Sequence, residues 1–135
     1  MKAALIGFLG GFAIIILFTL LKKFDKKIIY GLILTSIGFL YVGFTWSDLT
    51  LFIINSLQAV VFLFIAYFGI TRSVNLLIAG YFLHGAWDFL FSYFISTPLM
   101  PPQYDFFCLT IDWVIGFYLL IIKNQLMGYS LKPKA

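Results

Sequence analysis

Several polar side chains interrupt long apolar stretches of this sequence at spacings that place them on shared helix faces. His84 and Asp88 are four residues apart, and Asn55 and Gln58 are three apart, so each pair stacks on one side of a helix. Asp112 is a further acid inside an apolar stretch. Ionisable groups within a membrane are costly and usually face the interior of the helix bundle or a water-filled cavity. These residues therefore predict a polar site inside a membrane-embedded protein.

The composition supports this environment. Of the 135 residues, 63% are hydrophobic and 10% are charged, whereas a soluble domain has about 45–50% apolar and about 25% charged residues. An ordinary soluble enzyme and a disordered chain are both excluded. The formal net charge is +4, but the positive residues lie between or after the apolar stretches. That distribution is typical of membrane topology and not of a nucleic-acid-binding face.

Continuous apolar runs predict a single membrane domain, residues 1–135, that spans the bilayer with five helices. Each run is close to the roughly 20 residues that a transmembrane helix needs. Helices are expected rather than strands, because the runs are continuous and do not alternate. The fold class is therefore all-α, an integral membrane bundle. The predicted spans are residues 3–21, 28–45, 49–70, 74–95 and 106–122.

The distribution of lysine and arginine predicts the orientation of the bundle. Cytoplasmic loops carry an excess of these residues. If residues 22–27 are cytoplasmic, Arg72 and the lysines of the C-terminal tail fall on the same side, and only Lys2 lies outside. We therefore expect the N-terminus outside and the C-terminus inside, in the cell (cytoplasmic) membrane.

Polar residues from three predicted helices lie at similar depths. With a rise of about 1.5 Å per residue, Asn55, Asp88 and Asp112 lie roughly 9–10 Å from the outer ends of their helices. Gln58 is about one turn deeper, and His84 lies near the middle of its span. We expect these five residues to line an outward-facing polar cavity. Further candidates for its wall or lid are Tyr81, Trp87, Tyr104, Cys108 and Gly116.

Three functions remain open for this cavity. The leading one is the binding or transport of a small or amphiphilic molecule, and a histidine near mid-membrane could also relay protons. The second is an intramembrane enzyme in which His84 and an acid act as general acid and base on a lipid-like substrate. The third is an accessory subunit whose polar groups only join helices. The expected partners are the lipid bilayer and an unidentified small molecule or lipid, and no nucleic acid.

A metal site is a further use for the same side chains. His84, Asp88 and Asp112 offer nitrogen and oxygen donors that suit zinc or iron. Cys108 is four residues before Asp112, but it lies roughly 13 Å from His84 along the helix axes, so the four cannot join one site. We therefore expect neither a metal nor a cofactor. Cys108 is also the single cysteine, which excludes an internal disulfide.

The first apolar run carries a small-residue motif, G-x-x-x-G, at Gly7 and Gly11. Glycines at this spacing let two membrane helices approach closely. The sequence leaves open whether the motif packs within the chain or in a homo-oligomer.

The second half of the chain contains a His-Gly-x-Trp-Asp motif, a proline and tyrosine loop, and a Phe-Cys-x-x-x-Asp motif. In this sequence they are His84-Gly85-Ala86-Trp87-Asp88, then Pro101, Pro102 and Tyr104, then Phe107-Cys108 and Asp112, with Gly116 and Tyr118 following. In these motifs, over about residues 80–120, the chain resembles a group of small uncharacterised multi-pass membrane proteins of bacteria. The resemblance implies that the histidine, tryptophan, cysteine and two acids of the motifs act as one unit, and it assigns no activity. In that pattern further histidines follow the Trp-Asp pair, whereas Phe91, Ser92 and Tyr93 stand here, which argues against a metal.

Overall fold

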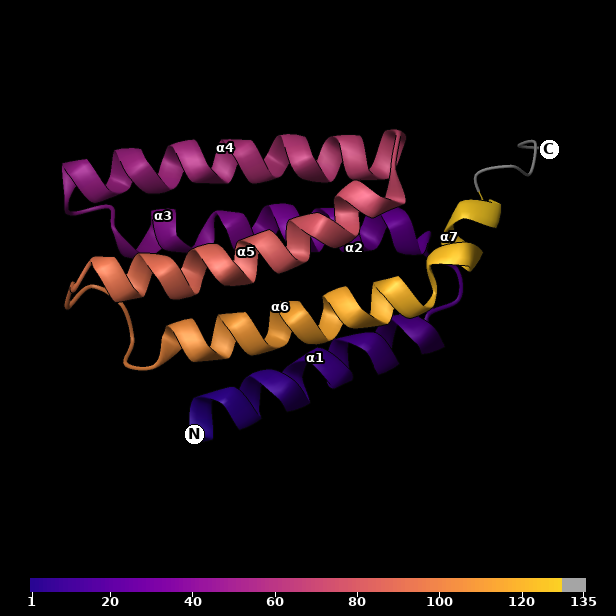
Figure 1. The fold of residues 1–135 in the computed structure, drawn as a ribbon, viewed down its shortest axis with the longest axis horizontal. Helices are drawn as coiled ribbons and strands as arrows, with labels where there is room; N and C mark the ends of the chain where they lie inside the picture. Colours follow the sequence, from indigo (N-terminus) through magenta and orange to yellow (C-terminus); the bar gives the residue numbers. More distant parts are fainter. Residues whose placement is uncertain (130–135) are drawn as a thin grey trace.

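Long helices run side by side in the computed structural model of the chain, which describes residues 1–129 (Figure 1). The described residues form no strand, and five helical segments are long and apolar enough to cross a membrane. The all-helical prediction is therefore confirmed, and the number of long apolar helices agrees with the number of predicted spans. The helices are α1 (Lys2–Leu20), α2 (Lys26–Gly38), α3 (Leu40–Phe44), α4 (Leu49–Thr71), α5 (Val74–Phe94), α6 (Tyr104–Ile121) and α7 (Lys123–Tyr129).

Helix α5 occupies the centre of the bundle. It packs against α4, α6 and α2, whereas α1 lies at the edge and packs mainly against α6 (Figure 1). Half of the apolar window of α5 is buried, compared with 11% for α1. The central position of α5 keeps its ionisable side chains, His84 and Asp88, away from the surface of the bundle.

The second predicted span is one apolar segment but not one regular helix. It divides at Phe39 into α2 and α3, and the Phe39 N–H bonds the carbonyl of Ser36 at 3.2 Å, which is a tighter turn than in an α-helix. The hydroxyls of Thr35 and Ser36 donate to carbonyl oxygens four residues earlier, at 3.0 and 2.9 Å. Such bonds bend helices, and glycine–serine pairs are common places for a kink. Together with Gly38 they account for the break.

Most of the described lysines and the single arginine lie at one end of the bundle. The α1–α2 turn, the α4–α5 turn and α7 lie at the right in Figure 1, so Lys22, Arg72 and Lys123 share that end. The N-terminus, the α3–α4 turn and the α5–α6 loop lie toward the other end. This alternation is the arrangement that five spans require. The short helix α7 has no counterpart among the predicted spans, and Lys132 and Lys134 lie outside the described residues.

The small-residue motif of α1 packs against α6. An ideal Cβ on Gly7 would lie 2.5 Å from the carbonyl oxygen of Phe107, and one on Gly11 would lie 2.8 Å from the Cγ1 of Val114. Any larger side chain would force the two helices apart. The motif therefore serves packing within the chain.

Candidate functional site

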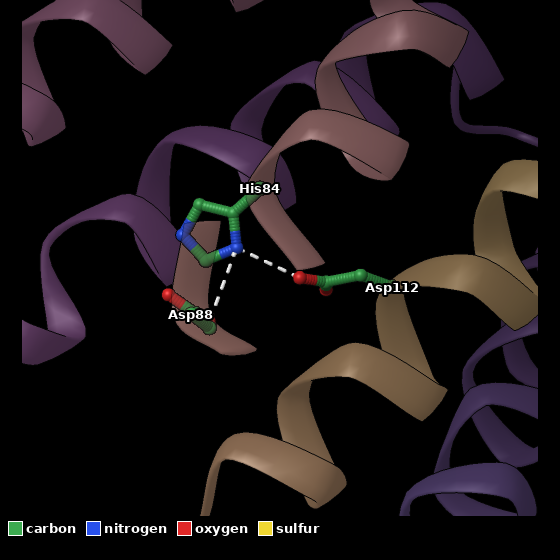
Figure 2. Close-up of side chains that lie close together, drawn as sticks. All are labelled: His84, Asp88 and Asp112. Atoms are coloured by element: carbon green, nitrogen blue, oxygen red, sulfur yellow. Dashed lines mark hydrogen bonds and ion pairs between the residues drawn. The ribbon is translucent and has the colours of Figure 1, made fainter. Parts of the chain in front are cut away.

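His84, Asp88 and Asp112 form one buried group between α5 and α6, which we name the acid–histidine cluster. The His84 Nδ1 atom lies 2.7 Å from an Asp112 carboxylate oxygen and 3.4 Å from an Asp88 oxygen (Figure 2). Each residue is 1% exposed. The structure therefore joins two acids to one imidazole nitrogen in the centre of the bundle.

The cluster forms because α5 and α6 approach closely at a glycine. An ideal Cβ on Gly85 would lie 2.9 Å from the indole ring of Trp113 and 3.3 Å from the Cβ of Asp112. Gly85 follows His84 directly, so the absence of a side chain there brings Asp112 within reach of the imidazole. Gly116 was expected in the wall of the polar cavity, where a glycine leaves space. Instead the Phe82 ring takes that space, about 3 Å from where the Cβ of residue 116 would lie.

Several polar atoms of the cluster have no hydrogen-bond partner. The short contact to Asp112 uses the Nδ1 atom of His84, and the Nε2 atom is buried without a partner. Both carboxylate oxygens of Asp88 are also buried without a hydrogen bond. The imidazole packs edge-on against Phe62, with ring centroids 4.8 Å apart. Leaving a buried polar group unpaired typically costs about 1–3 kcal/mol, so these atoms call for a physical explanation.

Asn55 and Gln58 lie on α4 and are buried separately from the cluster's bonding network. The Asn55 amide donates to the Thr45 hydroxyl at 3.2 Å and to the Leu51 carbonyl at 3.0 Å. It thereby joins α4 to the end of α3, which is the helix-joining role that the sequence left open. Gln58 is buried beside Gly38, and its amide has no partner. Within residues 1–129, no hydrogen bond or ion pair connects either residue to the acid–histidine cluster.

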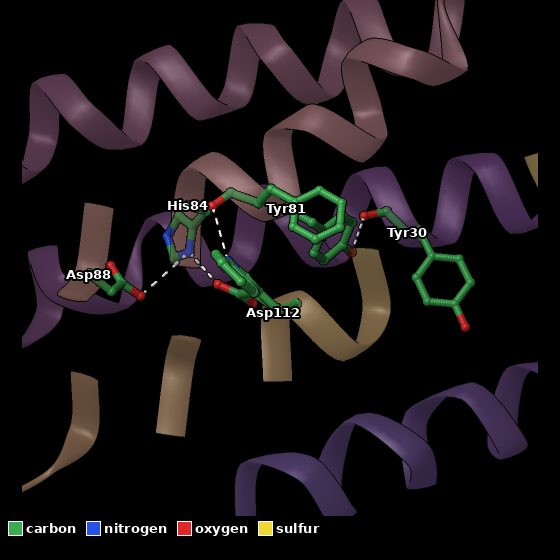
Figure 3. Close-up of polar contacts among 7 residues, drawn as sticks. Tyr30, Tyr81, His84, Asp88 and Asp112 are labelled. Carbon is green, nitrogen blue, oxygen red and sulfur yellow. Dashed lines mark hydrogen bonds and ion pairs between the residues drawn. The ribbon is translucent and has the colours of Figure 1, made fainter. Parts of the chain in front are cut away.

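Tyr81 serves the packing of α5 against α2. Its hydroxyl donates to the carbonyl oxygen of Tyr30 at 2.6 Å, and in Figure 3 its ring extends away from Asp88 toward Tyr30. Tyr81 is fully buried. It therefore borders the cluster on α5 without directing its hydroxyl toward the two acids.

Trp87, one residue before Asp88, is partly buried. Its ring packs against that of Phe91, with ring centroids 6.1 Å apart, and its indole nitrogen has no hydrogen-bond partner.

A pocket of about 240 Å³ lies beyond the cluster, where α5 ends and α6 begins. Its lining comes from the α5–α6 loop and the two helix ends: Ser92, Ile95, Ser96, Thr97, Met100, Pro101, Pro102, Gln103 and Asp105. Ser92 is one helical turn beyond Asp88 on α5, and Asp105 is one turn before Cys108 on α6. Polar residues therefore continue from the pocket toward the cluster on both helices.

Of two aromatic residues near this pocket, the sequence analysis predicted one and missed the other. Tyr104 was expected as a wall or lid residue, and its ring packs against Tyr41 and Phe44 at 5.9 and 5.1 Å. Tyr41 was missed, although it is 1% exposed and its hydroxyl is buried without a partner. Its hydroxyl is one of several in the predicted span of residues 28–45, so the sequence offered no signal that would single it out. Cys108 is buried in the same region.

Comparison with known proteins identifies a family but no characterised relative. The search of curated proteins and the search of solved structures found no match. One family model, described as a family of unknown function (DUF6010), matches residues 2–125. The match includes the first two spans, which the motif resemblance over residues 80–120 did not cover. Since nearly all of the described helices fall within the match, the chain belongs to this family of unknown function.

Proposed function

We propose that the chain is a multi-pass membrane protein that binds a small polar molecule or ion from the outer side, as a step in its transport. The observation that carries this proposal is the acid–histidine cluster itself. Two acids and a histidine, each 1% exposed, share one hydrogen bond inside an apolar bundle. Helix packing alone does not need a second carboxylate with two unpaired oxygens, because neutral side chains join membrane helices at lower cost.

The outer pocket supports an approach from one side. It adjoins the outer ends of α5 and α6, and Ser92 and Asp105 of its lining lie one turn from Asp88 and Cys108. A molecule that enters there meets hydroxyl, amide and carboxylate groups before it reaches the cluster. The pocket is therefore the proposed mouth of the binding route.

Native mass spectrometry tests this binding, because it weighs the protein together with any molecule that it carries. We expect the wild-type protein, released from detergent, to carry a bound species whose mass identifies its class. Asp112→Asn should lose that species, because it removes a charge from the cluster. A matched control is Asp25→Asn, which keeps a good helix cap at the opposite end of the bundle. The proposal would be contradicted if the wild-type protein carried no bound species. It would also be contradicted if Asp112→Asn carried the species to the same extent as the wild type.

The orientation is a separate prediction, since it decides which side the pocket faces. In a Cys108→Ser background the chain has no cysteine, so single cysteines report on accessibility. We expect a membrane-impermeant maleimide to label Gln103→Cys in intact cells and to label Lys23→Cys only after lysis. Both side chains are exposed in the bundle. Labelling of Lys23→Cys in intact cells would show that the bundle has the opposite orientation to the predicted one.

An intramembrane enzyme remains the second candidate, and one detail favours it. Asp112 holds the His84 Nδ1 atom, while the buried Nε2 atom has no hydrogen-bond partner. A carboxylate that orients one imidazole nitrogen and leaves the other for proton transfer is the arrangement of a general base. Turnover of a lipid-like substrate by purified protein in detergent, lost in His84→Gln, would favour this candidate over transport.

A further inference from the structure

We propose that the acid–histidine cluster binds a divalent transition-metal ion, with Zn²⁺ as the best fit. This inference rests on the proposed function, because it names the class of ion that the outward-facing site would hold. The donors are the imidazole of His84 and one carboxylate oxygen each from Asp88 and Asp112. Nitrogen and carboxylate oxygen donors are those that zinc accepts in proteins.

The positions of the donor atoms are close to those of a metal site. Three potential ligand atoms, one from each residue, lie within 4.8 Å of one another. With metal–ligand distances of about 2.1 Å, the ligands of a tetrahedral site are about 3.4 Å apart. The His84 Nδ1 atom already lies 3.4 Å from Asp88 and 2.7 Å from Asp112. An ion therefore fits between the three side chains if the 2.7 Å contact opens by about 0.7 Å and the widest pair, within 4.8 Å, closes by up to about 1.4 Å.

Asp88 supplies an independent reason for a cation. Its side chain is 1% exposed, yet neither oxygen accepts a hydrogen bond. Asp112, by contrast, accepts the short bond from His84. A buried carboxylate without donors must either take up a proton or face a positive charge, and an ion between the three side chains would supply that charge.

The charge balance points the same way. Two carboxylates, a neutral imidazole and a divalent ion sum to zero, which suits a site within apolar surroundings. With a protonated imidazole instead of the ion, two ionised carboxylates leave one negative charge in excess, unless one of the carboxyl groups keeps its proton. The ion pairs among residues 1–129 are the two contacts inside the cluster, so no described lysine or arginine offsets that charge.

The number of ligands also fits a site that exchanges its ion. A structural zinc site usually has four protein ligands, whereas sites with three keep one position for water or another molecule. Cys108 is buried nearby on α6 but does not belong to the group of donors within 4.8 Å. The open position would let an ion arriving from the outer pocket bind before it loses its last water.

Cobalt binding tests the metal directly. Protein purified through a tag without histidines is stripped with a chelator and titrated with Co²⁺, whose visible absorption reports a site of low coordination number. We expect one Co²⁺ per chain, displaced by Zn²⁺ and confirmed by elemental analysis. Asp88→Asn should weaken Co²⁺ binding at least about 100-fold, without loss of thermal stability, because the Asp88 oxygens accept no hydrogen bond. Asp25→Asn should bind as the wild type does.

The outcomes separate this inference from the proposed function. Failure of the stripped wild type to bind Co²⁺ or Zn²⁺ would overturn the metal site, as would unchanged binding by Asp88→Asn. If native mass spectrometry then found an organic molecule that depends on Asp112, the proposed function would stand without the metal. If neither a metal nor an organic molecule were bound, the metal site and the proposed function would both be wrong.

Discussion

His84→Gln is expected to fold and insert with a free energy of unfolding within about 1 kcal/mol of the wild type, yet to lose ligand binding at least about 100-fold. The glutamine amide can still donate a hydrogen bond to Asp112, which now receives one from the imidazole at 2.7 Å. It has roughly similar size, so the packing against Phe62 changes little. It cannot supply the imidazole nitrogen that the proposed site needs. Steric trapping in bicelles gives the stability, and Co²⁺ titration or native mass spectrometry gives the binding.

A second variant at the same position separates packing from hydrogen bonding. His84→Leu removes every donor from the Asp112 carboxylate, which is 1% exposed. Breaking a buried ionic contact by removing one partner costs about 3–5 kcal/mol, so this variant should be clearly less stable than His84→Gln. If His84→Gln instead lost stability in proportion to its loss of binding, His84 would be a residue that joins helices and nothing more.

The two acids are expected to behave non-additively. Asp88→Asn alone should be near neutral, because its oxygens accept no hydrogen bond. Asp112→Asn alone should cost about 1–3 kcal/mol, since His84 can turn from its 2.7 Å contact to Asp88, only 3.4 Å away. With both acids replaced, no carboxylate remains for the imidazole. The double variant should therefore lose more stability than the sum of the single variants, by about 0.5–3 kcal/mol.

A double-mutant cycle on the free energy of unfolding measures this coupling. A suitable control cycle pairs Asp112→Asn with Asn55→Ala, because Asn55 bonds Thr45 and has no bond to the cluster. The control pair should be additive within about 0.5 kcal/mol. Additive effects of the two acids, in stability and in ligand binding alike, would mean that they do not share one site.

The sequence by itself determined the helices and their apolar character. Uncharged runs of about 20 residues have only one stable form in a bilayer, because each backbone group must be satisfied within its own helix. The predicted span of residues 74–95 and the observed α5, Val74–Phe94, differ by a single residue. The shared face of His84 and Asp88 was equally determined, since a spacing of four residues stacks side chains on any α-helix.

The apolar pattern of the sequence did not predict the local departures from regular helix. The break at Phe39 depends on the hydroxyls of Thr35 and Ser36, which donate hydrogen bonds to carbonyl oxygens of their own helix. Elsewhere in a membrane helix the same residues can point to a neighbour, so composition alone does not predict a kink. Helix α7 follows the last apolar run and has too few residues to show a period.

The partners of the polar residues were decided only by tertiary structure. Depth along upright helices matched Asp112 with Asp88, but the direct contact of Asp112 is with His84, at 2.7 Å. Gly85 sets the separation of α5 and α6 at that level, and such a separation depends on which helix packs there, not on depth. For the same reason Asn55, at a matching depth, bonds Thr45 instead of the acids. Spacing within one helix is fixed by covalent geometry, whereas contacts between helices follow from which faces pack together and how closely.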